Sequence, residues 1–388
     1  MEFHLTEEQR DLQTMARDFT NKELIPIIGE CERNDTFPEE AYQKALDMGF
    51  HTLTIAKEYG GEGIDTFTNL LIKEELSRGD FGFTATLGAQ ALGFTPCEIQ
   101  GNDEQKRYYA QVIQNRGYLA LGMTEPNSGS DVAATSTTAV KDGDCYVLNG
   151  RKCFISNAPL ADIVSVLAVT DKTKGTKGMS LFMVEPKKTP GVSIGKHEDK
   201  MGIRLSPTAD VIFEDAQIPA ANLLGKEGEG FVGIMKTMDK ARVSASIGAV
   251  GIARAAYEHA VKYSQERVIM GSPIWQHGMV MAMIADMGID LEAARQMCWR
   301  AALSIDYNAP DAEKTKLSAM CKCFATEACS RVVDNALQIM GGYGYMRDYP
   351  IEKLYRDIRA FKIVEGTNQI QRIVAARSII AENRIPKR

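Results

Sequence analysis

Apolar residues recur at helical spacing in the first third of the chain. The stretches NLLIKEELSR (69–78) and NDEQKRYYAQVI (102–113) carry them every three to four residues, which predicts amphipathic helices. Thr6 and Gln9 have the spacing of a capping box, so a helix is expected to begin there. A glycine-rich loop at 57–66 separates the helical segments. The pattern predicts a helical domain over residues 1–118.

The pattern changes to short β-prone runs between residues 119 and 230. Asp142-Gly143 and Asn149-Gly150 are both tight-turn signals between such runs. Further strands are expected at DIVSVLAVT (162–170), MSLFMVE (179–185) and ADVIFEDAQIP (209–219). These features predict a compact middle β domain.

Long helical periodicity returns from residue 231 to residue 388. The expected helical stretches cover 231–268, 275–306, 311–340 and 367–382. The chain is therefore predicted to be α+β, with a helical N-terminal domain, a β middle domain and a C-terminal helical bundle.

Composition narrows the class of protein. The chain has 388 residues, of which 44% are hydrophobic and 25% charged, and its net charge is −6. These values are typical of a globular protein and speak against a general nucleic-acid or anionic-membrane binder. The N-terminal segment is acidic and amphipathic, unlike a signal peptide. With eight cysteines and no zinc-site spacing, we expect a cytoplasmic protein with reduced thiols and no metal.

Gly228, Gly230 and Gly233 form a literal G-x-G-x-x-G. A dinucleotide site requires a strand directly before this motif and an acidic residue about twenty positions later. The nearest expected strand ends near Asp215, and the later acidic residue is absent. We therefore interpret the glycines as a flexible connector between domains.

Two stretches of the middle domain have the composition of a ligand site. LGMTEPNSGSDV (121–132) runs from a strand into a Pro-, Asn-, Ser- and Gly-rich loop, whose Thr124, Ser128 and Ser130 hydroxyls could contact a flat polar ligand. In KCFISNA (152–158), Phe154 and Ser156 occupy alternate strand positions, so a ring and a hydroxyl face the same side. A polar turn and a structural aromatic residue remain the simpler alternatives.

The C-terminal part carries charged and glycine-rich candidates. Asp239 and Arg242 are three apart on an Ala/Gly-rich helix, which suits an intrahelical ion pair or a ligand contact. Arg267 is either a favourable helix-end charge or a phosphate ligand. Gly341-Gly342 predicts a helix C-cap and permits close approach of a ligand.

Glu365 lies between an apolar pair and a predicted helix start. Thr367 or Asn368 could cap that helix, and Glu365 alone could be an anion favoured by the helix N-terminus.

Taken together, these stretches resemble the acyl-CoA dehydrogenase family of flavoproteins. Seven motifs occur in order along the chain: the N-terminal helices, TEPNSGSD, FISN, DKARVSA, SQERVIMG, QIMGGYGY and VEGTNQIQR. The resemblance implies a β-sandwich-like middle domain, a C-terminal four-helix bundle and a homotetramer. It also implies non-covalently bound FAD, an acyl-CoA substrate and an electron-transferring flavoprotein as electron acceptor.

The resemblance assigns roles to individual residues. Glu365 would remove the proton α to the thioester carbonyl, while the β hydrogen leaves as hydride to flavin N5. Ser130, Asp239, Arg242 and Gly366 would contact the substrate. The residues implied to bind FAD are Leu121, Met123, Thr124, Ser130, Phe154, Ile155, Ser156, Arg267, Gln338, Gly341, Gly342, Thr367 and Gln369. Arg267 and the 338–342 turn would reach the cofactor of a neighbouring subunit.

The chain departs from the family pattern at two positions. Val364 occupies a position where many straight-chain members have Tyr, which suggests room for a branched, cyclic or aromatic acyl group. Gly278 follows His277 where a Gln is frequent, so one usual cofactor contact is missing. Residues 83–97 contain no charge, which favours a neutral acyl chain.

Several functions remain open from the sequence. The same residues would serve an acyl-CoA dehydrogenase or an enoyl-CoA reductase that runs the reaction backward. An acyl-CoA oxidase is disfavoured because those members are commonly longer. A family member without catalysis, acting as a binding module, is disfavoured by the presence of Glu365 and Arg242.

Overall fold

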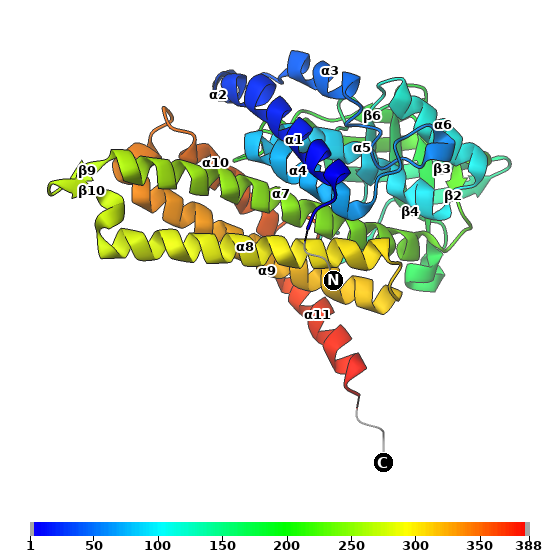
Figure 1. The fold of residues 1–388 in the computed structure, drawn as a ribbon. Helices are drawn as coiled ribbons and strands as arrows, with labels where there is room; N and C mark the ends of the chain where they lie inside the picture. The colour runs from blue at the N-terminus through cyan, green and yellow to red at the C-terminus, as the bar shows by residue number, and fades with distance from the viewer. Residues whose placement is uncertain (1–3, 385–388) are drawn as a thin grey trace.

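The computed structural model describes residues 4–384, in three successive parts (Figure 1). The first part is helical, as predicted, although residues 1–3 of the predicted N-terminal segment lie outside the described range. Its helices are α1 (Glu7–Phe19), η1 (Thr20–Leu24), α2 (Ile25–Asn34), α3 (Glu39–Asp47), η2 (Lys57–Tyr59), α4 (Thr66–Gly79), α5 (Phe81–Gln100) and α6 (Asp103–Gln114).

Side chains at the helix starts explain several boundaries. The predicted capping box of Thr6 and Gln9 is confirmed at the start of α1, with both reciprocal hydrogen bonds present. Asn102 and Gln105 form a second capping box before α6. Asp80 caps α5 through the Phe83 N–H, so a helix covers the uncharged segment 83–97.

The strands of the middle part form an eight-stranded mixed sheet in the described residues. Its order is β6-β7-β3-β2-β4-β5-β8, and β1 pairs in parallel with β4. The elements are β1 (Leu119–Gly122), η3 (Val132–Ala134), β2 (Thr138–Asp142), β3 (Cys145–Ser156), β4 (Ile163–Val169), η4 (Lys172–Gly178), β5 (Met179–Val184), β6 (Val192–Ile194), β7 (Thr208–Pro219), η5 (Ala220–Asn222) and β8 (Leu223–Leu224).

One of the two predicted tight turns is wrong. Asp142 pairs with Cys145 across a hairpin, which confirms the first turn. Asn149-Gly150 instead lies inside β3, where the register with β7 shifts in a bulge. Gly150 has φ 148°, and a Cβ there would lie 2.5 Å from Thr137 Oγ1. The glycine therefore allows the close approach of a neighbouring strand rather than a chain reversal.

Long helices make up the third part. The four predicted helical stretches correspond to α7 (Gly230–Glu266), α8 (Gly278–Asp306), α9 (Asp311–Met340) and α11 (Asn368–Glu382). A further helix, α10, was not expected from the pattern. The shorter elements here are β9 (Val268–Ile269), β10 (Ser272–Pro273), η6 (Ile274–Gln276), η7 (Gly341–Tyr345), α10 (Ile351–Arg359) and η8 (Ala360–Lys362).

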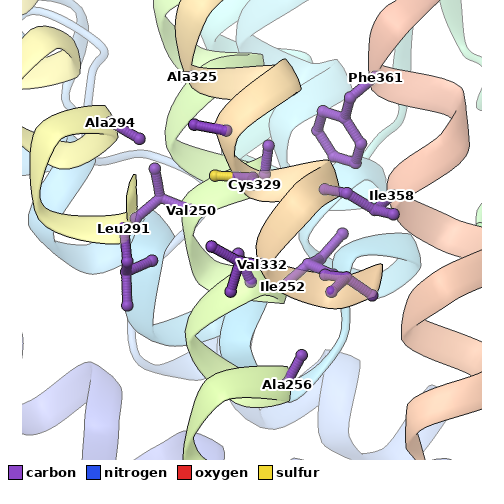
Figure 2. Packing of buried hydrophobic residues seen from close by; sticks show 14 of the residues in the cluster. Val250, Ile252, Ala256, Leu291, Ala294, Ala325, Cys329, Val332, Ile358 and Phe361 are labelled. Carbon is purple, nitrogen blue, oxygen red and sulfur yellow. The ribbon is translucent and has the colours of Figure 1, made fainter. Parts of the chain in front are cut away.

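Small side chains allow the helices of the bundle to pack closely. Figure 2 shows Ala256, Ala294 and Ala325 among the larger apolar residues of α7, α8 and α9. On α7, a Cβ at Gly251 would lie 2.6 Å from the Glu74 carbonyl oxygen of α4. The Ala- and Gly-rich face of α7 thus brings the first and third parts into contact.

The glycines of the G-x-G-x-x-G are packed, so their interpretation as a flexible connector is wrong. A Cβ at Gly230 would lie 2.6 Å from the Ser180 carbonyl carbon, and one at Gly233 would lie 2.4 Å from Gln100 Oε1. The short strand β8 also lies closer to the motif than the strand end expected near Asp215. The motif opens α7 against the sheet.

Within residues 4–384, no helix is long and apolar enough to cross a membrane. The same residues contain no group of three or more His, Cys, Asp or Glu side chains that could hold a metal ion. All eight cysteines are free.

Candidate active site

A cavity of about 620 Å³ lies where the three parts of the chain meet. Helices α4, α5 and α7 form much of its wall, and Phe154 and Ser156 of β3 reach it from the sheet. Val364 and Glu365 complete the wall from the segment before α11. Residues from all three predicted domains therefore contribute to one site.

The turn that carries Glu365 has an uncommon backbone. Glu365 has φ 54° and Gly366 has φ 83°, and a non-glycine residue in this region costs about 1–3 kcal/mol. The turn is anchored by Lys322 Nζ, which donates to the Gly366 carbonyl oxygen at 2.8 Å, and by Gln371 Nε2. Thr367 caps α11, which confirms the predicted helix start. Such strain at a cavity is typical of a functional position.

The Glu365 carboxylate faces three cations without touching them. Burial raises its pKa, whereas the charges of Arg242, Lys322 and Lys73 act in the opposite direction. In the described part of the chain, no group donates a hydrogen bond to this carboxylate. The carboxylate does not cap α11, so the interpretation of Glu365 as a helix-entry anion has no support in the contacts.

The Glu365 backbone N–H is also free of an acceptor among the described residues, whereas Val364 N–H donates to the Ala360 carbonyl oxygen at 3.0 Å. A free N–H beside an available carboxylate provides a hydrogen-bond donor and a proton acceptor within one residue. This pair is suited to removing a proton from carbon while stabilising the negative charge that forms on a carbonyl oxygen.

The predicted alternation of Phe154 and Ser156 is confirmed. Both residues line the cavity, and Phe154 is 67% exposed with φ 60°. The intervening Ile155 points into the core of the sheet, at 3% exposure. Only the backbone of Ile155 is therefore available to a cofactor.

A buried ion pair fixes the loop after β1. Lys152 Nζ lies 2.7 Å from Glu125 Oε1 and 3.2 Å from the Met123 carbonyl oxygen. Although burial raises the pKa of Glu125, Lys152 and hydrogen bonds from Ser136 and Thr137 lower it to about 2. The pair was not predicted from the sequence, and it ties Met123 and Thr124 to the strand that carries Phe154.

The two serines of the loop after β1 differ in whether a ligand could reach their hydroxyl groups. Ser130 and Gly129 are exposed, whereas Ser128 is buried and donates to the Asp131 carbonyl oxygen at 2.8 Å. The Ser128 hydroxyl is thus used within the turn, and the expectation that it contacts a ligand is wrong. Leu121 is buried in the core beside Met123.

Gln369 is exposed at the start of α11, close in sequence to Glu365, whereas Arg267, Gln338, Gly341 and Gly342 lie at the opposite end of the bundle. Arg267 immediately precedes β9, and Figure 1 shows β9 and β10 far from β2 and β3. The Arg267 guanidinium lies 5.7 Å from the ring centre of Tyr343, which places it beside the turn of Gly341 and Gly342. Gln338 is exposed one helical turn earlier. One copy of the chain does not bring these residues to Phe154.

Arg242 lies within Coulomb range of Glu365 and pairs with Asp239 at 2.7 Å. Asp239 also accepts hydrogen bonds from Thr315 and Ser318. The predicted ion pair is therefore present, and the predicted substrate contact of both residues stays a prediction. Lys73 and Lys322 were missed, because a single lysine in a helical stretch gives no sequence signal for a site.

The site has features that suit a flavin. Phe154 presents an exposed ring beside a serine hydroxyl at the cavity. At Gly341 and Gly342, a Cβ would meet no atom within 4 Å, so this turn is open to a bound group. The aromatic face of Phe154 is suited to stacking on a planar ring, and the separate glycine turn at the other end of the bundle is suited to close approach of a bound group.

Comparison with protein families identifies the chain. The acyl-CoA dehydrogenase N-terminal domain matches residues 6–115, the middle domain matches 120–216 and the C-terminal domain matches 228–380. This protein belongs to the acyl-CoA dehydrogenase family. It is an oxidoreductase acting on CH–CH groups, and FAD is its cofactor.

Three curated relatives are similar over nearly their whole length. The chain is 43% identical to acryloyl-CoA reductase (NADH) of Anaerotignum propionicum, over 98% of this chain and 96% of the relative. It is 41% identical to 3-(aryl)acrylate reductase of Clostridium sporogenes, over 97% and 99%. It is 40% identical to the caffeyl-CoA reductase-Etf complex subunit CarC of Acetobacterium woodii, over 96% and 98%.

Two solved structures have the same fold as this chain. Butyryl-CoA dehydrogenase from Megasphaera elsdenii is 37% identical, with a TM-score of 0.94 over 98% of this chain and 100% of that chain. An FAD complex of PigA is 28% identical, with a TM-score of 0.92 over 98% and 99%. The three-domain fold expected from the sequence is thereby confirmed, while the exact domain boundaries stay a prediction.

Proposed function

We propose that this protein catalyses the α,β-dehydrogenation of an acyl-CoA thioester to the 2-enoyl-CoA. Glu365 is assigned as the base that removes the α proton. The observation that carries this assignment is a carboxylate in the wall of the same cavity as Phe154 and Ser156, with no hydrogen-bond or ion-pair partner among residues 4–384. When bound, FAD supplies the acceptor for the β hydride.

Electrostatics supports this role for Glu365. The raised pKa makes the carboxylate a stronger base than an exposed glutamate. The charges of Arg242, Lys322 and Lys73 partly offset the effect of burial on this pKa, and their positive charge also favours the anionic enolate. The Glu365 N–H would donate to the thioester oxygen, which holds the α carbon next to the carboxylate of the same residue.

The reverse reaction is the second candidate. Three relatives at 40–43% identity are named as reductases of CoA esters or of acrylates. In this direction, protonated Glu365 would deliver a proton to the α carbon of an enoyl-CoA. The raised pKa of Glu365 suits this role too, because it increases the protonated fraction.

The partners proposed for the chain are an electron-transferring flavoprotein and further copies of itself. A relative at 40% identity is named as a subunit of a complex with Etf, which supports the first. The separation of Arg267, Gln338 and Gly341 from Phe154 supports the second, because a neighbouring copy in a homotetramer could complete the cofactor site.

The acyl group is proposed to be larger than a short linear chain. Val364 lines the cavity and is 39% exposed, so its small side chain leaves space beside Glu365. Replacing Val364 with Tyr should reduce turnover of cyclic and aromatic acyl-CoAs more than turnover of linear ones. A wild-type enzyme that accepts only linear chains would contradict this assignment.

The test of the function uses the purified protein loaded with FAD. Acyl-CoAs are added without oxygen while the flavin absorbance is recorded, and enoyl-CoAs are added to the reduced protein. Bleaching by an acyl-CoA supports dehydrogenation, and reoxidation by an enoyl-CoA at a higher rate favours the reductase. A protein that neither takes up FAD nor responds to any CoA ester would favour the alternative of a non-catalytic binding module.

A further inference from the structure

A small side pocket of about 30 Å³ adjoins the cavity, and its lining combines polar side chains with apolar ones such as Phe50, Leu53 and Leu87. His51, Thr54, Asn69 and Thr84 contribute to its lining, together with the side chain of Lys73. Thr54, Asn69, Lys73 and Thr84 also line the main cavity. The side pocket therefore lies next to the space that a substrate of Glu365 would occupy.

The half-buried Lys73 side chain reaches the cavity without a carboxylate of residues 4–384 in hydrogen-bonding contact with its ammonium. Its hydrogen bond goes to Ser244 Oγ of α7, and in residues 4–384 no carboxylate forms an ion pair with it. Burial lowers the pKa of Lys73 to about 8, so the ammonium is still mostly charged at pH 7. A Cβ at Gly88 would lie 3.5 Å from Lys73 Nζ, so the lack of a side chain at Gly88 leaves space beside the ammonium.

Apart from Glu365, the other charged groups on the cavity wall have partners. Lys240 pairs with Glu98 at 2.8 Å, and Lys200 donates to the Ser206 carbonyl oxygen at 2.7 Å. Asp65 and Asp306 accept backbone N–H groups at the start of α4. His51 Nδ1, by contrast, is buried without a hydrogen-bond partner in the described residues. His51 and Lys73, which both line the side pocket, thus have nitrogen atoms that can form further hydrogen bonds.

We propose that Lys73 and the side pocket receive an oxygen-bearing group on the acyl chain, either a carboxylate or a hydroxyl, so that Lys73 determines acyl specificity. The assignment rests on the proposed function, because it requires the thioester at Glu365. The Lys73 ammonium has Ser244 Oγ as its hydrogen-bond partner, and the charge of Glu365 acts on it only from a distance. Its remaining N–H donors therefore favour a further oxygen acceptor, which a purely apolar chain end would not provide. A carboxylate would revise the expectation of a neutral acyl group, which considered only residues 83–97, whereas a hydroxyl would agree with it.

The test compares three acyl-CoAs of equal chain length that end in a methyl, a hydroxyl or a carboxylate group. The ratio of kcat/KM between oxygenated and methyl chains is measured with an artificial electron acceptor, for the FAD-loaded wild type and Lys73→Met. We expect the wild type to prefer an oxygenated chain and the variant to lose about 10- to 100-fold of that preference. If Lys73→Met loses the preference for the carboxylate chain alone, the substrate group that Lys73 recognises is anionic. If it loses the preference for both oxygenated chains, a hydroxyl is sufficient for recognition.

Two further variants keep the test decisive. Lys236→Met removes a lysine of α7 that pairs with Asp311 outside the cavity, and it should leave the preference unchanged. Asn69→Leu alters the same pocket from another position and should also reduce the preference for oxygenated chains. It therefore tests the proposal even if Lys73→Met does not fold. FAD content and Tm report on folding in every case.

A wild type that prefers the methyl chain would overturn the assignment. So would a Lys73→Met variant that slows all three substrates equally, because Lys73 would then act through Glu365 rather than on the acyl group. Failure of the proposed function looks different: no acyl-CoA bleaches the wild-type flavin at all.

Discussion

Two carboxylates of this protein, Glu125 and Glu365, are each enclosed near cationic side chains, yet they have opposite chemistry. Glu125 touches Lys152 at 2.7 Å and accepts hydrogen bonds from Ser136 and Thr137, and its pKa falls to about 2. Glu365 is near Arg242, Lys322 and Lys73 but contacts none of them, and its pKa is raised. Direct contact makes a buried carboxylate structural, whereas charges at a distance leave it available for proton transfer.

Glu365→Gln should produce the largest effect, because it removes the proton acceptor and leaves the shape of the site intact. We expect activity with the best acyl-CoA to fall about 10²- to 10⁴-fold with FAD content unchanged. Steady-state turnover with an artificial acceptor measures this. Glu40→Gln, at an exposed position of α3, is the control and should retain full activity. Comparable activity in the two variants would show that the reaction does not require the Glu365 carboxylate.

Lys152→Met should destabilise the fold by about 3–5 kcal/mol, because it leaves Glu125 buried without its partner. Urea unfolding of the FAD-loaded proteins measures the change. Adding Glu125→Gln should recover part of the loss, since the unpaired charge is then absent.

The same pair has a defined pH dependence. Since folding lowers the pKa of Glu125 from 4.5 to about 2, its stabilisation is present above pH 4.5 and is lost as the pH falls through about 2. Lys152→Met should lack this part of the acid sensitivity. Identical acid unfolding curves for wild type and variant would show that contact with Lys152 does not set the state of Glu125.

Arg242→Gln should raise the pKa of Glu365 further, because one of the charges that lowers it is removed. The rising limb of kcat/KM against pH in the dehydrogenation direction should therefore move to higher pH. A pH–rate profile of the FAD-loaded variant measures the shift. A limb that moves to lower pH would contradict the electrostatic description of the site.

Lys22→Met should have the smallest effect, because the pair of Lys22 and Asp18 is exposed on both sides, at 70% and 56%. We expect the free energy of unfolding to change by less than about 0.5 kcal/mol. Urea unfolding beside Lys152→Met provides the contrast between a solvated pair and a buried one. A loss of similar size in both variants would mean that burial is irrelevant to these ion pairs.

Much of the fold could be predicted because its signals are local. Capping residues such as Thr6, and periodic apolar positions along α7, act within a few residues of themselves. The turn predicted at Asn149-Gly150 was wrong because Gly150 allows Thr137, directly before β2, to approach closely. No local sequence pattern reveals such a contact. Helix α10 was missed inside an aromatic-rich segment with glycine signals on its N-terminal side.

The site was only partly predictable for the same reason. Glu365, Phe154 and Ser156 lie in motifs, so the family resemblance could locate them. Lys73 and Lys322 come from other helices and matter only through their distance to Glu365, which depends on the packing of α4 and α9. The Glu125–Lys152 pair likewise joins residues on separate elements.

The most direct test of the central claim is exchange of the substrate α hydrogen with solvent. An acyl-CoA that bleaches the flavin is incubated in D₂O with the FAD-loaded wild type or with Glu365→Gln, and deuterium at the α carbon is measured by mass spectrometry. The account predicts incorporation with the wild type and none above background with the variant. Incorporation at the same rate in both would show that another group removes the α proton.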